Sequence, residues 1–212
     1  MNADFICDLR RDRLPFENAS IDAFYSSHMI EHLSHEAGLQ LFRDIYRCLK
    51  HEGFCRLVTP DMDLLLDRYK AGDWRFFLAA DGRFILNQIC KGVLSPESLL
   101  IHNRLAGWFA SYSGRSDTGG GPIVHRQRVD ERLASLSKYD FRDWCVSLLV
   151  PTRVHAHIHL YDYDELHASL KSAGFGAVVR SSYGKSECAE MRRSPIDRKG
   201  RQMYSLYVEA RK

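Results

Sequence analysis

The 212-residue chain has the length of one ordinary domain with room for an elaboration, and it can bury a substantial core. Its apolar fraction of 45% and charged fraction of 27% are those of a soluble globular protein and exclude a disordered chain. The net charge of +3 is too small to point to nucleic acid as a partner, and no run approaches the roughly 20 apolar residues of a membrane span.

Six cysteines lie at positions 7, 48, 55, 90, 145 and 188, without any Cys-x-x-Cys pair. Cys7 and Cys55 stand in apolar, strand-like runs, so we expect both to be buried free thiols. Asp4 and Asp8 interrupt any apolar run at the start, so no signal peptide is expected. These features predict a protein of the reducing cytoplasm with no membrane partner.

Two strands are predicted near the start of the chain. Asp4–Cys7 is a short apolar run that ends at Asp8, which is typical of a buried strand with a carboxylate at its carboxyl end. Leu14-Pro15-Phe16 is extended or a turn, because proline fixes φ. Ile21–Tyr25 is the second predicted strand.

A helix and a third strand follow. Ser34 is a good N-cap for a helix whose apolar residues recur at helical spacing, and Lys50 and Gly53 supply stop signals. Phe54–Val58 is the next strand, ended by Pro60. Such short connections imply a parallel sheet with crossover helices.

The middle of the chain, residues 74–150, is predicted as a helical insertion after a short helix from Met62 to about Tyr69. Arg126–Trp144 has a helical pattern. The run Ser116–Pro122, with three successive glycines, predicts a flexible loop within the insertion. A long loop of this kind is typical of a lid or a substrate-recognition element.

The last part of the chain has a regular pattern. Asp162 and Glu165 form a capping box before a helix that Gly174 stops. Phe175–Ser181 and Met203–Ala210 are predicted strands, with a long polar excursion between them. We therefore expect one domain, 1–212, in which residues 1–73 and 151–212 form the sheet core.

These segments resemble a known family. The run of Asp8, Leu14-Pro15-Phe16, Ser26-Ser27-His28, Glu31-His32-Leu33 and Pro60-Asp61 resembles the second half of a class I S-adenosylmethionine-dependent methyltransferase. The tail, His159–Asp162, Ala173–Phe175 and Ser205–Ala210, is similar to the closing strands of that family. The closest likeness is to bacterial predicted methyltransferases of the type-11-like group, often linked to cell-surface polysaccharide genes.

The resemblance implies an α/β fold with a Rossmann-like methyltransferase sheet. The first strand of the family and its glycine-rich turn would precede Asp4 and are not found here, so the sheet is expected to be N-terminally truncated. Gly119–Gly121 follows no strand and cannot replace the turn. The Ile21–Tyr25 strand would then lack a neighbour. We expect either Asp4–Cys7 or a second chain, as in a homo-oligomer, to cover that edge.

The resemblance also implies S-adenosylmethionine as the cofactor. Asp8 and Leu9 stand where the family contacts the adenine, and Ser26, Ser27 and His28 stand beside the methionine part and the transferred methyl group. A structural interpretation of Asp8, as a cap at the end of a strand, stays open.

The histidines near the second strand form a pattern of their own. His28, Glu31, His32 and His35 would share one face of a helix, where they could ligate a metal or supply a general base. His28 and His32 are the candidate catalytic bases. As an alternative, His28-x-x-Glu31-His32 is similar to the metal site of the small-RNA 3′-end 2′-O-methyltransferases, in which a further histidine matches His157. A third interpretation is that Glu31 and His32 only hydrogen-bond at the pocket wall.

Another histidine run, His155-Ala156-His157-Ile158-His159, alternates as a strand would, which places three imidazoles on one face. A solvent-facing strand with alternating polar residues explains this pattern equally well.

Two functions follow. The first is methyl transfer from S-adenosylmethionine to an oxygen or nitrogen of an unidentified small-molecule or saccharide acceptor, an in-line displacement that needs positioning and, for a hydroxyl, a base. The second is a non-catalytic binding or assembly module that has lost the cofactor loop. The missing glycine-rich turn favours the second, while Asp8, Ser27, His28, Glu31 and His32 favour the first.

Overall fold

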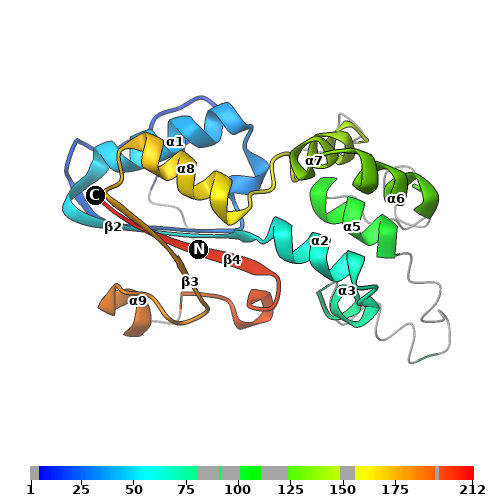
Figure 1. Ribbon diagram of the computed structural model, residues 1–212. Coiled ribbons are helices and arrows are strands. Elements are labelled where there is room, and N and C mark those ends of the chain that lie inside the picture. Colours follow the sequence, from blue (N-terminus) through cyan, green and yellow to red (C-terminus); the bar gives the residue numbers. More distant parts are fainter. Residues whose placement is uncertain (1–4, 81–90, 92–100, 111–123, 149–155, 194–195) are drawn as a thin grey trace. The chain divides into compact units, whose positions relative to one another are not determined.

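The computed structural model describes residues 5–80, 91, 101–110, 124–148, 156–193 and 196–212, which form two compact units (Figure 1). The first unit is Met1–Asp61 with Tyr161–Lys212, and the second is Met62–Leu160. Among the described residues, no helix combines the length and the hydropathy needed to cross a bilayer.

The first unit is built on a sheet that, in the described part of the chain, has four strands in the order β1-β2-β4-β3. The strands are β1 (Ile21–Ser27), β2 (Leu49–Pro60), β3 (Ala177–Ser181) and β4 (Ser205–Arg211). β1 and β2 are parallel, whereas β4 runs antiparallel to both of its neighbours. The predicted α/β fold and these strands are confirmed, but parallel pairing is limited to β1 and β2.

The crossover between β1 and β2 is α1 (His35–Cys48), and its start is the predicted one, because Ser34 Oγ accepts a hydrogen bond of 3.2 Å from Ala37 N. The predicted stop at Gly53 is wrong. Gly53 lies inside β2, within an irregularity where the pairing with β1 jumps from Leu49 to Phe54. A Cβ on Gly53 would meet Lys50 O at 2.7 Å, so this bulge requires glycine.

A second helix, α8 (Tyr163–Ala173), lies with α1 on one face of the sheet (Figure 1). Its caps are the predicted ones. Asp162 Oδ1 accepts from Glu165 N at 2.7 Å, and Gly174 ends the helix at φ = 112°. Both capping signals depend on residues close together in the sequence, so they could be predicted without knowledge of the fold.

The core of the first unit fills the space between the sheet and these two helices. Along β2, Cys55 and Leu57 point into this core, and the residue between them, Arg56, belongs to the opposite face. The segment that carries α9 (Ala189–Arg193) and a 3-10 turn, η3 (Lys199–Arg201), covers that second face (Figure 1). The fully buried core residues include Phe42, Ile45, Cys48, Leu49, Cys55, Tyr161, Leu166, Leu170 and Val208.

The predicted strand at Asp4–Cys7 is wrong for the residues that are described. Phe5 is 59% and Ile6 96% exposed, Cys7 is half-buried rather than buried, and none of them pairs with β1. Among the described strands β1 pairs with β2 alone, so this segment does not cover its edge. Cover by a second chain stays a prediction.

The chain instead runs along α1 after Asp12. Asp44, a buried carboxylate of α1, accepts from Leu14 N, and the Arg47 guanidinium donates to Leu14 O at 3.1 Å and to Phe16 O at 2.7 Å. These contacts satisfy backbone groups that a strand pairing would otherwise have used.

The regular elements of the second unit, among its described residues, are all helices. Its helices are α2 (Met62–Lys70), α3 (Trp74–Ala80), α5 (Ile101–Ala110), α6 (Arg126–Ser135) and α7 (Lys138–Ser147). The predicted helix at Arg126–Trp144 is divided in two, because the Ser137 side chain caps α7 by accepting from Asp140 N. The predicted loop at Ser116–Pro122 lies outside the described residues.

The predicted strand at residues 155–159 is wrong where it is described, since Ala156–Leu160 has no strand pairing. His157 Nδ1 lies 2.6 Å from Trp108 O, and His159 Nε2 lies 3.2 Å from the Arg142 guanidinium. His157 and His159 therefore contact different groups and do not share one face of a strand.

Candidate functional site

The candidate site lies at the carboxyl end of β1, the position at which open α/β sheets bind ligands. Ser26 is buried and Ser27 half-buried, and together they end the strand. His28 N still donates to Val58 O at 2.8 Å, but His28 itself has φ = 51°. A left-handed conformation is uncommon in residues other than glycine, and histidine is one of the residues that adopt it more often.

The His28 side chain, 8% exposed, lies between two polar groups. Its Nε2 is 2.8 Å from Ser205 Oγ, and its Nδ1 is 3.4 Å from Glu31 Oε1. The second oxygen of the fully buried Glu31 accepts from Thr59 Oγ1 at 3.3 Å. Glu31, His28 and Ser205 thus form a continuous polar chain from the interior to the start of β4.

Two proton arrangements fit this chain, because Ser205 Oγ also lies 2.8 Å from Arg201 O. When the hydroxyl donates to that carbonyl, His28 carries its proton on Nε2 and donates to Ser205. When the hydroxyl turns to His28, Nε2 becomes an acceptor and Nδ1–H points at Glu31. The second arrangement gives the buried carboxylate a donor and leaves Nε2 able to take a proton.

His28, Glu31, His32 and His35 would share one face only if one helix spanned them, and this condition is not met. The chain forms a 3-10 turn, η1 (Ile30–His32), and starts α1 only after Ser34, so His28 precedes both helices. His28 and Glu31 nevertheless meet, whereas His35 Nδ1 approaches Glu165 at 3.7 Å. His32 is half-buried at the end of η1.

The alternative metal set is divided between the two units. His28, Glu31 and His32 belong to the first, and His157 belongs to the second. Both ring nitrogens of His28 already have polar neighbours, Nε2 beside Ser205 Oγ and Nδ1 beside Glu31 Oε1. This metal site stays a prediction.

Asp8 occupies a tight turn instead of a strand end. Its carbonyl accepts from Arg11 N at 3.0 Å and Asp12 N at 2.8 Å. Its carboxylate accepts from Arg10 Nε at 2.8 Å and Arg11 Nε at 3.0 Å, and the hydrogen bonds from Arg10 hold the pKa of Asp8 well below its ordinary value. Leu9 is half-buried and packs against the core.

The residues expected to contact S-adenosylmethionine differ in how well they fit it. Leu9 offers apolar surface for a ring, and Ser27 and His28 stand at the strand end with polar groups. Asp8 fits only when the two arginines release it, since both of its carboxylate oxygens are engaged. Such exposed ion pairs are weak, so a ligand can displace them.

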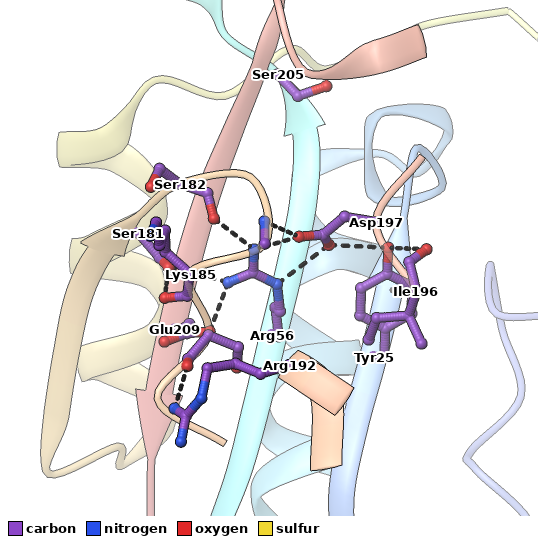
Figure 2. Close-up of polar contacts among 12 residues, drawn as sticks. Tyr25, Arg56, Ser181, Ser182, Lys185, Arg192, Ile196, Asp197, Ser205 and Glu209 are labelled. Carbon is purple, nitrogen blue, oxygen red and sulfur yellow. Dashed lines mark hydrogen bonds and ion pairs between the residues drawn. The ribbon is translucent and has the colours of Figure 1, made fainter. Parts of the chain in front are cut away.

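Behind β2 lies a buried charge network that the sequence analysis missed (Figure 2). Arg56, fully buried, donates to the two carboxylate oxygens of Asp197 at 3.2 and 2.6 Å and to Glu209 Oε1 at 2.5 Å. Its other N–H groups reach Ser181 Oγ at 3.0 Å and Ser182 O at 2.9 Å. All five guanidinium donors are therefore used.

This network fixes the loop that follows β3. Gly184 N donates to Asp197 Oδ2 at 3.0 Å, and Glu187 N donates to Glu209 Oε2 at 3.0 Å. Burial alone would raise the pKa of Asp197, but the hydrogen bonds from Arg56 and Gly184 outweigh it and lower that pKa. A signal existed in the sequence, because Arg56 and Glu209 interrupt otherwise apolar strands, and a charge there must be paired.

Comparisons with known proteins bear on the first part of the chain. Residues 4–57 match the family model described as a methyltransferase domain, and this segment contains β1, α1 and the first part of β2. No match was found among proteins with curated functions.

Two solved structures are similar to the chain at low identity. An S-adenosylmethionine-dependent methyltransferase from Mesorhizobium loti is 16% identical, over 97% of this chain and 67% of that one, with a TM-score of 0.40. A SAM-dependent methyltransferase from Archaeoglobus fulgidus is 12% identical, over 93% of this chain and 62% of that one, with a TM-score of 0.39. Both TM-scores lie below 0.5, so no function is assigned from these two structures.

Proposed function

We propose that the chain, whose residues 4–57 match the model of a methyltransferase domain, is a class I S-adenosylmethionine-dependent methyltransferase that transfers a methyl group to a hydroxyl of a small-molecule or saccharide acceptor. The observation that carries this proposal is the position of His28. It lies at the end of β1, with Glu31 behind its Nδ1 and Ser205 before its Nε2.

A hydroxyl acceptor must lose its proton as the methyl group arrives, and His28 is placed to receive that proton. In the arrangement where Ser205 donates to Nε2, the acceptor proton passes to Ser205 Oγ while the Ser205 proton passes to His28. The buried Glu31 carboxylate then faces the imidazolium that forms, which stabilises the charge. The cofactor supplies the methyl group as an electrophile.

Leu9, Ser27 and His28 are the residues proposed to contact the cofactor in this chain, with Ser26 supporting the strand end from its buried position. Asp8 joins them when Arg10 and Arg11 turn away into solvent. His32 is proposed as a second base candidate, placed one residue beyond Glu31 at the end of η1.

Calorimetric titration of S-adenosylmethionine into the 212-residue protein tests the proposal, with S-adenosylhomocysteine as the second ligand. We expect micromolar binding of both, weakened in Leu9→Ala. Asp22→Asn is the matched control, since Asp22 is exposed and pairs with Lys50 at the other end of β1. Absence of heat at millimolar ligand would contradict the proposal and leave the non-catalytic binding module as the better description.

A further inference from the structure

A cavity of about 580 Å³ opens in the first unit where the loop after β3 faces the start of β4. Its wall includes Arg180, Lys185, Ser205 and Tyr207. This volume lies within the range of roughly 300–1,000 Å³ that is usual for small-molecule sites. The cavity is separate from the strand end at Ser27, but Ser205 connects it to His28.

The charges on the wall favour an anion. Arg180 is 52% exposed and approaches Asp61 only at 4.0 Å, while its guanidinium lies 5.0 Å from the centre of the Tyr163 ring. Lys185 has no carboxylate partner among the residues that the structure describes. Two cations therefore face the cavity with one acidic residue, Asp61, beside them.

The side chain of Tyr207 adds a buried phenol to this wall. Tyr207 is 4% exposed, and its hydroxyl has no hydrogen-bond partner within the described part of the chain. Burial raises the pKa of Tyr207 to about 12, so the hydroxyl keeps its proton. This phenol therefore forms a neutral part of the wall next to the two cations.

The loop on the far side of the cavity is held rigidly. Ser181 Oγ donates to Lys185 O at 3.0 Å and accepts from Arg56, and Ser182 O accepts from both Arg56 and Lys185 N (Figure 2). Gly184 is tied to Asp197 in the same network. The backbone of Lys185 is therefore held in place before any ligand binds, while its side chain stays exposed.

We propose that this cavity binds a small hydroxylated molecule that carries one oxyanion group, phosphate or carboxylate. Arg180 and Lys185 contact the oxyanion, and Ser205 contacts a hydroxyl group. On the function proposed above, this molecule is the methyl acceptor, because the hydroxyl that meets Ser205 lies on the proton path to His28.

Calorimetric titration of the full chain with glucose 6-phosphate, glucuronate and glucose tests the assignment without any cofactor. We expect one of the two anions to bind with a dissociation constant at least roughly tenfold below that of glucose, since a charge-assisted hydrogen bond is worth about that factor. The tighter of the two identifies the oxyanion. Lys185→Gln should weaken that binding about tenfold.

Lys50→Gln is the control, because Lys50 is an exposed lysine whose ammonium pairs with Asp22, away from the cavity. The assignment is overturned when neither anion binds more tightly than glucose, or when Lys185→Gln binds like the unchanged protein. Anion binding without S-adenosylmethionine binding supports the cavity and contradicts the methyltransferase proposal. Cofactor binding without anion binding overturns the proposed anion site and leaves the methyltransferase proposal in place.

Discussion

His28 Nε2 and Ser205 Oγ lie 2.8 Å apart, although 177 positions separate these residues in the chain. The contact exists because β4 runs antiparallel to β2 and begins beside Pro60, the last residue of β2. The start of β4 therefore reaches the same edge of the sheet as the carboxyl end of β1. A serine from the end of the sequence thus meets a histidine from its beginning.

The first prediction concerns the His28 tautomer. With Glu31 ionised, we expect the proton of the neutral ring on Nδ1, and Glu31→Gln should move it to Nε2 because the new amide donates to Nδ1. Long-range ¹H–¹⁵N spectra of labelled protein distinguish the two forms. The same tautomer in both proteins would show that Glu31 does not set the state of His28. His51→Gln is the control, since His51 is exposed.

The second prediction concerns the buried network around Arg56. Arg56→Met removes the cation and leaves Asp197 and Glu209 facing each other without it, so we expect a loss of about 3–5 kcal/mol in the free energy of unfolding. Denaturant unfolding measures this. Arg43→Met, at an exposed position of α1, should change stability by less than about 0.5 kcal/mol. Similar values for the two variants would refute a structural role for the network.

The third prediction is the pH dependence of that network. The pKa of Asp197 is lowered by folding from its ordinary 3.8, so its contribution is complete above that pH and is lost as pH falls towards the lowered value. The stability difference between the unchanged protein and Asp197→Asn should therefore shrink below pH 3.8. Unfolding curves at neutral and acidic pH supply the comparison, and a constant difference would disprove the linkage.

The fourth prediction concerns a close approach in the core. A Cβ on Gly38 of α1 would overlap the hydroxyl of Tyr161, whose ring is fully buried and cannot move aside. Gly38→Ala should destabilise the protein by about 1–3 kcal/mol despite the higher helix propensity of alanine. Gly200→Ala is the control, because a Cβ at Gly200 would meet no atom within 4 Å beyond the adjoining backbone. Equal melting temperatures for both variants would show that the helix shifts to make room.

Features whose causes lie within a few residues were predictable. The caps at Ser34 and Asp162 and the left-handed Gly174 depend on side chain and backbone groups at most a few positions apart. The strands could be placed because apolar residues cluster in them. The same local patterns misplaced Asp4–Cys7, because an apolar run does not reveal whether a free strand edge is within its reach.

The sequence by itself determined the α/β class, the main helices and strands, and the match of residues 4–57 to a methyltransferase-domain model, since each follows from local patterns along the chain. Only the tertiary structure decided that His28 meets Glu31 and Ser205, and that Arg56 is neutralised by Asp197 and Glu209. The physical reason is the insertion of β4 beside β2. Pairing between distant strands brings charges and hydrogen-bonding groups together, and no spacing in the sequence records that proximity.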